Sequence, residues 1–373
     1  MFKKFTRKQM VYYTLLAFCF ITSVLFVNHN YSLYNRSIAE ITAISIEEET
    51  PMTDRHGNED LLVVQQIEAI VKNGIEKGQH VQLTNEYSYS GAFDQAYRVG
   101  HDVFIQFETT TRDVPTLTGT ITDLKRDKHV LLIAWIFIFA LLLIGRRSGF
   151  FAICSFVINV LILSFALDVY IKHSSINLLL ICGVCILLFT CISLVFVSGF
   201  TDKTYAAIVA TLLSTFLSLA ITYVVISVTS GNGLRYEEMQ FLTRPYELVF
   251  MGGLFIGSLG AIMDIAITMS SSIFALYDKN PTISLKTLRS SGMAIGREIM
   301  GTITNILFFA YISGALPMLI LSFKNATPLG FTFSMNLSLE IARALAGGIG
   351  IVITIPIGVY TTLFFITRKK ARL

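Results

Sequence analysis

The sequence predicts an α-helical integral membrane protein with about eight transmembrane helices and one small β-rich domain between the first two. Three observations lead to this fold class. Of the 373 residues, 53% are hydrophobic and only 14% are charged, whereas an average soluble domain carries about 25% charged residues. Eight segments are apolar enough to cross a bilayer, and one polar stretch separates the first two of them. This composition excludes a soluble enzyme, a disordered chain and a nucleic-acid-binding module, so we expect no nucleic acid among the partners.

The eight apolar segments define the membrane part of the chain. A helix needs about 20 mostly apolar residues to span the hydrocarbon, because backbone groups find no water there. The segments comprise residues 10–27, 130–144, 150–171, 176–197, 205–228, 248–276, 295–321 and 339–366. Four basic residues precede the first segment and no small-residue cleavage site follows it. We therefore expect an uncleaved signal anchor, with a cleaved signal peptide as the alternative.

Lysine and arginine residues in the short loops predict the orientation. With the N-terminus inside, fourteen basic residues fall on the cytoplasmic side and four on the opposite side, and an excess of Lys and Arg marks the cytoplasmic side. Both termini are therefore expected in the cytoplasm. Residues 30–128 then lie outside and hold sixteen acidic and nine basic residues, whereas the remainder holds nine acidic and twenty basic ones. The formal net charge of +4 thus combines two oppositely charged parts.

Residues 30–128 are expected to form the outer β-rich domain. Before it lie a cytoplasmic N-terminus and the signal-anchor helix (residues 1–29), and after it a seven-helix membrane domain (residues 129–373). Polar and apolar residues alternate in short runs, and glycine-containing turns separate the runs. The strand-like runs are residues 61–70, 81–83, 103–107 and 118–124. Their length and spacing predict a small β-barrel or sandwich, such as an OB-type barrel.

The acidic residues of this domain are interpreted as a solvated loop. They are Glu47, Glu48, Glu49, Asp54, Glu59 and Asp60. Because their spacing matches no calcium-binding loop, the sequence assigns no metal. The five cysteines all lie in apolar runs, so we expect no disulfide in this domain. We also expect no cofactor and no enzymatic activity, because the chain has no nucleotide-binding loop and no hydrolase or protease motif.

Asp264 is the main candidate functional residue, because an ionisable side chain at mid-bilayer costs about 2.5–3.5 kcal/mol or more. At 3.6 residues per turn it shares one helix stripe with small and hydroxyl-bearing residues. The stripe comprises Gly253, Gly257, Gly260, Asp264, Thr268 and Ser271. Glycines allow a second helix to approach closely, and the hydroxyl groups extend the polar line. The stripe is typical of a helix that lines a pathway or packs tightly against a partner.

The last two predicted spans carry further polar residues. In the seventh, Glu298, Thr302 and Asn305 share one face, and Arg297, Gly301 and Asn305 share the adjacent one. We expect Arg297 to be the partner that neutralises Asp264. The eighth span begins with Glu340 and Arg343, continues with Gly347 and Gly348 and contains Pro356. Glycines followed by a proline predict a bent or broken helix of the kind that transporters use to bind ions, although local pairing or interfacial anchoring also explains the charged residues.

Two of these segments resemble the YibE/F-like family of multi-pass bacterial membrane proteins. The similarity rests on the runs Gly257-Ser258-Leu259-Gly260-Ala261-Ile262-Met263-Asp264 and Gly296-Arg297-Glu298-Ile299-Met300-Gly301-Thr302-Ile303-Thr304-Asn305, and on Ser270–Ser272. The resemblance implies a membrane transport protein of the bacterial cytoplasmic membrane. It also implies that Asp264, Arg297 and Glu298 occupy the family's own acidic and Arg-Glu positions, and it makes a related second subunit conceivable.

The leading functional hypothesis is a secondary transporter or exporter of a small solute or ion, in which Asp264 binds a cation or proton. Its partners would be the lipid bilayer, the transported solute or ion, and a second copy or a related membrane subunit. The alternative is a non-transporting scaffold that presents its outer β-domain to envelope machinery, with Asp264 in a structural ion pair. The sequence specifies neither the substrate nor the direction of movement, the coupling ion or the oligomeric state.

Overall fold

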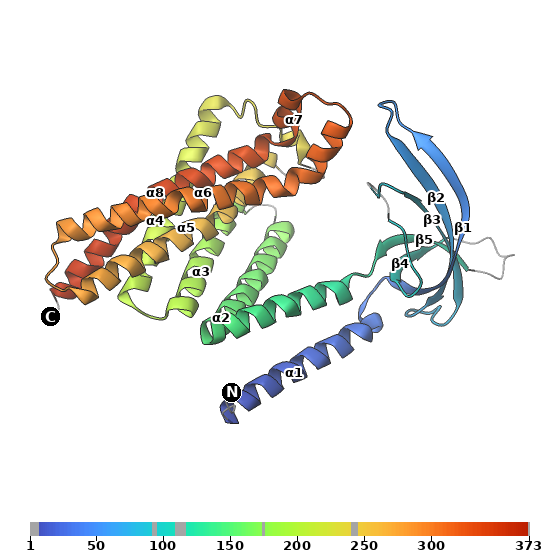
Figure 1. Cartoon of the computed structure of the whole chain (residues 1–373), viewed down its shortest axis with the longest axis horizontal. Coiled ribbons are helices and arrows are strands. Elements are labelled where there is room, and N and C mark those ends of the chain that lie inside the picture. The colour runs from blue at the N-terminus through green and yellow to red at the C-terminus, as the bar shows by residue number, and fades with distance from the viewer. Residues whose placement is uncertain (1–6, 92–94, 109–116, 174–175, 240–244, 372–373) are drawn as a thin grey trace, which may run out of the picture. The chain divides into compact units, whose positions relative to one another are not determined.

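A computed structural model describes residues 7–91, 95–108, 117–173, 176–239 and 245–371. The chain is mostly helical and contains one small β-sheet domain, as predicted (Figure 1). It divides into two compact units, Met1–Leu143 and Ile144–Leu373.

The sheet of the first unit is a closed five-stranded barrel. Its strands are β1 (Ser37–Thr53), β2 (Glu59–Val71), β3 (His80–Ser88), β4 (Asp102–Phe107) and β5 (Leu117–Leu124). They follow each other around the barrel in the order β1-β2-β3-β5-β4, and β3 pairs with β5 in parallel while the other neighbours are antiparallel. Alternate residues such as Ile41, Ile67, Leu83 and Val103 are almost fully buried and form the core. A small five-stranded barrel is the architecture of the OB-fold.

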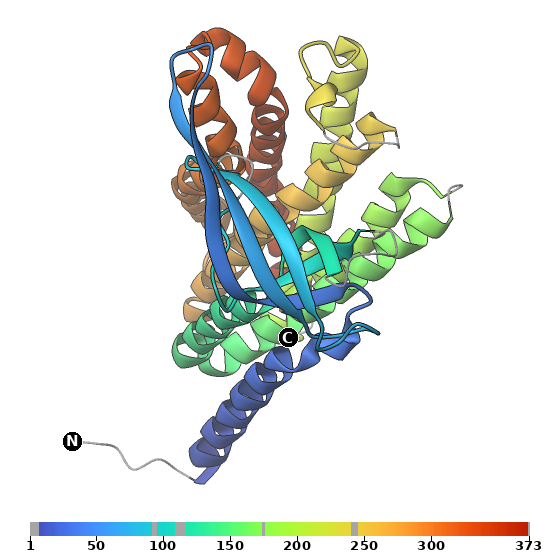
Figure 2. The same ribbon diagram turned by 90° about the vertical axis from the view of Figure 1, so that its right-hand side faces the viewer.

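The strand β1 was absent from the sequence prediction, and it changes the interpretation of the acidic residues. Glu47, Glu48 and Glu49 lie in β1, and Glu59 lies in β2. Only Asp54 lies in the connecting turn, where its carboxylate accepts hydrogen bonds from the backbone of His56 (2.8 Å) and Asn58 (2.9 Å). The expectation of a solvated acidic loop is therefore wrong: most of these side chains lie on a long β-hairpin, which extends past the other strands in Figures 1 and 2.

An ionic cluster at the base of the barrel connects it to the helix α1 (Arg7–Asn28) and to the start of the helix α2 (Asp127–Lys172), whose first part belongs to the same unit. The side chain of Lys125 is 1% exposed, donates to Asp127 at 2.7 Å and to the backbone oxygen of Val27 at 3.3 Å. Lys128 donates to Asp102, also at 2.7 Å. The Tyr31 hydroxyl, in the short helix η1 (Asn30–Leu33), also donates to Asp102, and burial together with this carboxylate raises the pKa of Tyr31 to about 12. We call these residues the juxtamembrane joint.

Within the described residues, six helices are long and apolar enough to cross a membrane. They are α2, α3 (Leu178–Ser198), α4 (Asp202–Thr229), α5 (Tyr246–Lys279), α6 (Leu285–Lys324) and α8 (Ser338–Lys370). The helix α1 contributes a shorter apolar stretch, Thr14–Asn28. Arg146 interrupts the helical geometry of α2 with φ 47° and ψ −118°. A further short helix that was not predicted, α7 (Leu329–Asn336), precedes α8. Of the two predicted alternatives for α8, bent or broken, the break is absent, because α8 is continuous through Pro356.

The second unit packs through small residues. In α8, glycines lie against α4, α5 and α6, and in α4 a row of buried hydroxyl residues occupies one face. This row comprises Thr204, Thr211, Thr215, Ser218 and Thr222. The hydroxyl of Ser218 donates to the backbone oxygen of Ala346 in α8 at 3.0 Å. Small side chains allow helices to approach closely where no hydrophobic effect drives association, which explains this composition.

Candidate functional site

Asp264 lies on the exposed face of α5, opposite the face that packs into the second unit. The helix buries residues such as Phe255, Ile262 and Met269, whereas Asp264 is exposed. The predicted stripe is exposed along with it at Gly253, Gly257 and Gly260, and half-buried at Thr268 and Ser271. Within the part of the chain that the structure describes, the Asp264 carboxylate forms no hydrogen bond or ion pair. The stripe is thus continuous, but it faces outward from the chain.

The glycines of the stripe differ in their surroundings. A β-carbon on Gly257 would collide with the hydroxyl of Tyr311 in α6, so this glycine permits a close contact between helices. Gly253 and Gly260 have open space around the same position, as does Gly301 in α6. Of these four glycines, Gly257 is the one that lies directly against a neighbouring helix.

The contacts between α5 and α6 set the depth of Asp264. A β-carbon on Gly296 would lie 3.2 Å from the Met269 side chain, and one on Gly257 would meet Tyr311. The later residue of α5 thus contacts the earlier residue of α6, so the two helices are antiparallel. Asp264 lies five residues before Met269, and Gly301 lies five residues after Gly296. At about 1.5 Å per residue, Asp264 and Gly301 are therefore at about the same level. Thr302 lies at nearly the same depth.

The other predicted residues of α6 are also exposed. Glu298 lies about one turn from the level of Asp264, and Asn305 lies about one turn on the other side. Arg297 is exposed, and its Nε donates to the backbone oxygen of Met293 at 3.3 Å. The structure contains no Arg297–Asp264 ion pair between these described side chains, so the expected neutralising contact is not formed.

Glu340 and Arg343 come together in a cavity at the opposite end of α6 from its N-terminus. They form an ion pair with each other, and the Arg343 guanidinium lies 5.3 Å from the centre of the Phe250 ring. The cavity has a volume of about 500 Å³ and is also lined by Met239, Val249, Gly314, Ala315, Met318, Met335, Asn336 and Leu339. The two charged residues that the sequence singled out at the start of the eighth span therefore line one cavity between α5, α6, α7 and α8.

Two hydroxyl groups between this cavity and the level of Asp264 were missed by the sequence prediction. The hydroxyls of Tyr311 and Thr304 in α6 are buried and have no hydrogen-bond partner among the described residues. They are seven residues apart and so lie on one helix face, and Tyr311 lies one turn before Gly314 and Ala315, which line the cavity. We call Thr304, Tyr311, Glu340 and Arg343 the polar row. A search for hydroxyls at two-turn spacing, in addition to charges, would have found its inner half.

The methyl group of Thr304 faces the glycines of α8. A β-carbon on Gly348 would be 3.7 Å from the Thr304 methyl group, and one on Gly347 would collide with Leu307. Gly347 and Gly348 therefore allow α8 to approach α6 closely beside the polar row. A buried hydroxyl without a partner costs roughly 1–3 kcal/mol, and such groups in native proteins call for a structural or functional explanation.

Comparison with known families identifies the chain. The family model described as "YibE/F-like protein" matches residues 133–368, which include the polar row and Asp264, and the model described as "YibE/F family N-terminal domain" matches residues 32–124. The chain belongs to the YibE/F-like family. Comparison with curated proteins gave no match, and comparison with solved structures gave none either. The two family descriptions name no substrate and no reaction.

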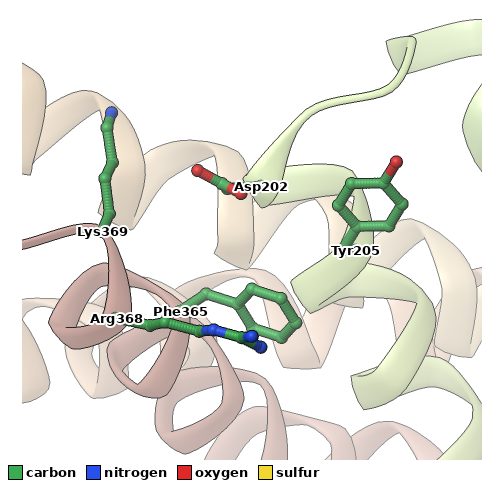
Figure 3. Close-up of a pocket in the computed structure, with 5 residues that line it drawn as sticks. All are labelled: Asp202, Tyr205, Phe365, Arg368 and Lys369. Atoms are coloured by element: carbon green, nitrogen blue, oxygen red, sulfur yellow. The ribbon is translucent and has the colours of Figure 1, made fainter. Parts of the chain in front are cut away.

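The YibE/F-like chain has a second, smaller pocket where α4 begins and α8 ends. Asp202 and Tyr205 reach it from α4, and Phe365, Arg368 and Lys369 from α8 (Figure 3). Its volume is about 180 Å³, and Lys369 is already paired with Asp278 at 3.1 Å. Charged residues commonly flank apolar spans, so we assign no function to this pocket. The described residues also contain no group of three or more His, Cys, Asp or Glu side chains positioned to hold a metal ion.

Proposed function

We propose that this YibE/F-like chain is a secondary transporter or exporter of a small solute or ion in the bacterial cytoplasmic membrane, coupled to an ion gradient through Asp264. The observation that carries the proposal is the polar row. Two buried hydroxyls lie on α6 between a charged cavity and the level of the Asp264 carboxylate, within helices of transmembrane length, and none of these three groups has a partner among the described residues. Buried hydroxyls without a partner call for a structural or functional explanation, and a pathway for a polar solute or ion supplies one.

The proposed topology has eight crossings, with both termini in the cytoplasm and the barrel outside. At about 1.5 Å per residue, the 46 residues of α2 extend to roughly 70 Å, about twice the hydrocarbon thickness. The non-helical geometry at Arg146 supports a division of α2 into two crossings. The 22 residues of α1 suffice for one more, as an uncleaved signal anchor. The excess of basic residues on the cytoplasmic side supports the orientation.

In the proposed mechanism, Asp264 binds a proton or cation and releases it on the opposite side. The hydroxyls of Thr304 and Tyr311 replace water ligands of the transported species as it moves from the cavity toward Asp264. Thr302, at the depth of Asp264, and Asn305 are the nearest candidates to stabilise the carboxylate between cycles, in place of Arg297. Because Asp264 faces outward and a charge exposed to hydrocarbon is costly, a second copy of the chain or a related subunit covers this face.

Flux measurements in reconstituted vesicles test the proposal. The full chain and the variants Asp264→Asn and Glu298→Gln are compared for uptake of protons and of sodium ions under an imposed gradient. Asp278→Asn, at the end of the same helix, is the matched control. We expect loss of flux in Asp264→Asn, reduced flux in Glu298→Gln and wild-type flux in the control. Undiminished flux in both test variants would remove these residues from the mechanism.

A second candidate function, a membrane scaffold without transport activity, is favoured by the β1–β2 hairpin. This hairpin extends past the barrel and exposes most of its β1 side chains, as a recognition surface does. Replacing residues 30–128 by a short linker while keeping the helices separates the two functions. A cellular phenotype that persists without the barrel supports transport, whereas its complete loss in a chain that still inserts into the membrane supports the scaffold.

A further inference from the structure

The strand β1 has one paired edge and one largely open edge. It pairs with β2 from Ala39 to Thr53, but with β4 only from Ser37 to Glu40. The loop before β4 continues the pairing to Ile41, which exchanges hydrogen bonds of 2.9 Å with Gly100 and His101. From Ala43 to Thr53, no strand among the described residues pairs with this edge. A long open edge presents backbone donors and acceptors that an added strand can satisfy.

Charge restricts what can occupy this edge. Glu47, Glu48 and Glu49 are consecutive and exposed on it, and residues 42–66 of the hairpin contain six acidic residues but one basic residue. Edge-to-edge pairing of two copies would bring these glutamates together, and like charges on neighbouring strands are destabilising. An anionic membrane surface would repel the edge as well. A segment that carries lysine or arginine is complementary to it.

A groove that lies over the paired strands β1 and β2 and reaches β3 borders the first part of this edge. It has a volume of about 500 Å³ and is lined by Ala43, Ile44, Ser45, Glu47, Gln66, Ile67, Glu68 and Gln82. Glu47 accepts a hydrogen bond from Gln66 at 2.7 Å, which fixes the carboxylate at the groove. An added strand would lie about 4.8 Å from β1, on the side away from β2. Long basic side chains that cross the face of β1 come within reach of Glu47.

We propose that the open edge of β1 from Ala43 to Thr53 is a docking site for an extended, basic segment of another polypeptide, which adds to the barrel as a further strand. Its backbone pairs with β1, and its lysine or arginine side chains meet those glutamates among Glu47, Glu48 and Glu49 that lie on the same face of the sheet. This interaction is independent of transport through α5 and α6. On the proposed topology, the chain's own basic termini lie on the other side of the membrane, so the segment comes from a different protein.

Binding of a defined peptide tests the proposal. The probe is a fluorescent octapeptide that alternates lysine and valine, added to the full chain in nanodiscs of zwitterionic lipid. The test variant carries Glu48→Lys and Glu49→Lys. The control carries Glu76→Lys and Asp123→Lys, which change the net charge equally but lie off the edge. A second peptide, N-methylated at alternate residues, has the same charge but cannot complete the backbone pairing.

We expect saturable binding to the wild type, affinity lower by about tenfold in the edge variant, and affinity within about twofold of wild type in the control. We expect the N-methylated peptide to bind the wild-type chain at least about tenfold more weakly, and the probe to slow amide hydrogen exchange in residues 43–49. The absence of saturable binding, or an equal loss in both charge variants, would overturn the proposal. Equal binding of the two peptides to the wild-type chain would also overturn the proposal. This comparison needs no protein variant, so it does not depend on whether a variant folds.

Discussion

Replacing Lys125 by methionine tests whether the juxtamembrane joint stabilises the first unit. The side chain of Lys125 is 1% exposed, and that of its partner Asp127 is 23% exposed. Removing one member of a buried ion pair costs about 3–5 kcal/mol, because the other charge is left without compensation. Asn30 and Tyr34 still donate to Asp127 at 3.1 and 3.0 Å. We therefore expect the lower end of the range, about 3 kcal/mol.

The matched control is Lys72→Met. Lys72 pairs with Glu40 in the same barrel, but these side chains are 31% and 39% exposed, and solvated pairs contribute at most about 1 kcal/mol. For a domain of this size, 1 kcal/mol shifts the melting temperature by about 4–8 °C. We expect Lys125→Met to lower it by at least about 12 °C and Lys72→Met by at most about 8 °C.

The only tryptophan of the chain provides the assay. Trp135 in α2 donates a hydrogen bond to Ser23 of α1 at 2.8 Å and packs edge-on against Phe20. Its emission, recorded while the full chain is heated in detergent, reports the loss of contact between these helices. Combining Lys125→Met with Asp127→Asn removes both charges and is expected to restore part of the stability. Equal melting of the two single variants would refute the assigned role of the joint.

Three further predictions concern backbone geometry and titration. Gly257→Ala is expected to destabilise the detergent-solubilised chain by about 1–3 kcal/mol, because the new methyl group displaces Tyr311. Gly253→Ala has open space around the new methyl group and is expected to be neutral or stabilising by up to about 1 kcal/mol. Thermal unfolding of the two variants measures the difference. Arg146→Gly is expected to raise the melting temperature by a few degrees, because φ 47° strains a residue with a side chain; an unchanged or lower value contradicts this. The raised pKa of Tyr31, about 12, means that the unfolded chain loses this proton first, so stability falls as the pH rises from about 10 to 12. Tyr31→Phe is expected to flatten that part of the curve of melting temperature against pH, and an identical slope contradicts the assignment.

Helical and alternating patterns predicted the elements well, because both depend on local sequence. All eight apolar segments are helical, and the four strand-like runs became β2 to β5. The strand β1 was not predicted, because three consecutive glutamates break the alternation of polar and apolar residues. Its register with β2 also shifts between Ile41 and Ala43 and between Ile46 and Glu48. A bulge changes which side chains share a face, so a strict period of two does not detect such a strand.

The candidate site was predictable only in part. Periodicity correctly put Asp264 on one stripe with Gly253 and Gly260, but it does not specify which face of a helix meets a neighbour, and this stripe is exposed. The polar row depends on contacts between α5, α6 and α8, and its Thr304 and Tyr311 are uncharged and unremarkable in the sequence. The residues of the juxtamembrane joint are still farther apart in the sequence: Tyr31 and Asp102 are separated by 71 residues and meet through tertiary structure.

The most direct test of the polar row as a transport pathway is the accessibility of Thr304 to water. In a cysteine-free background, Thr304→Cys is exposed to a membrane-impermeant thiol reagent from the outer side, with Leu307→Cys as the control. Leu307 is 8% exposed and lies one turn away against α8, and its replacement opens more space. A pathway predicts modification at position 304 and none at 307. An unreactive cysteine at 304, or equal reaction at both positions, would contradict the account.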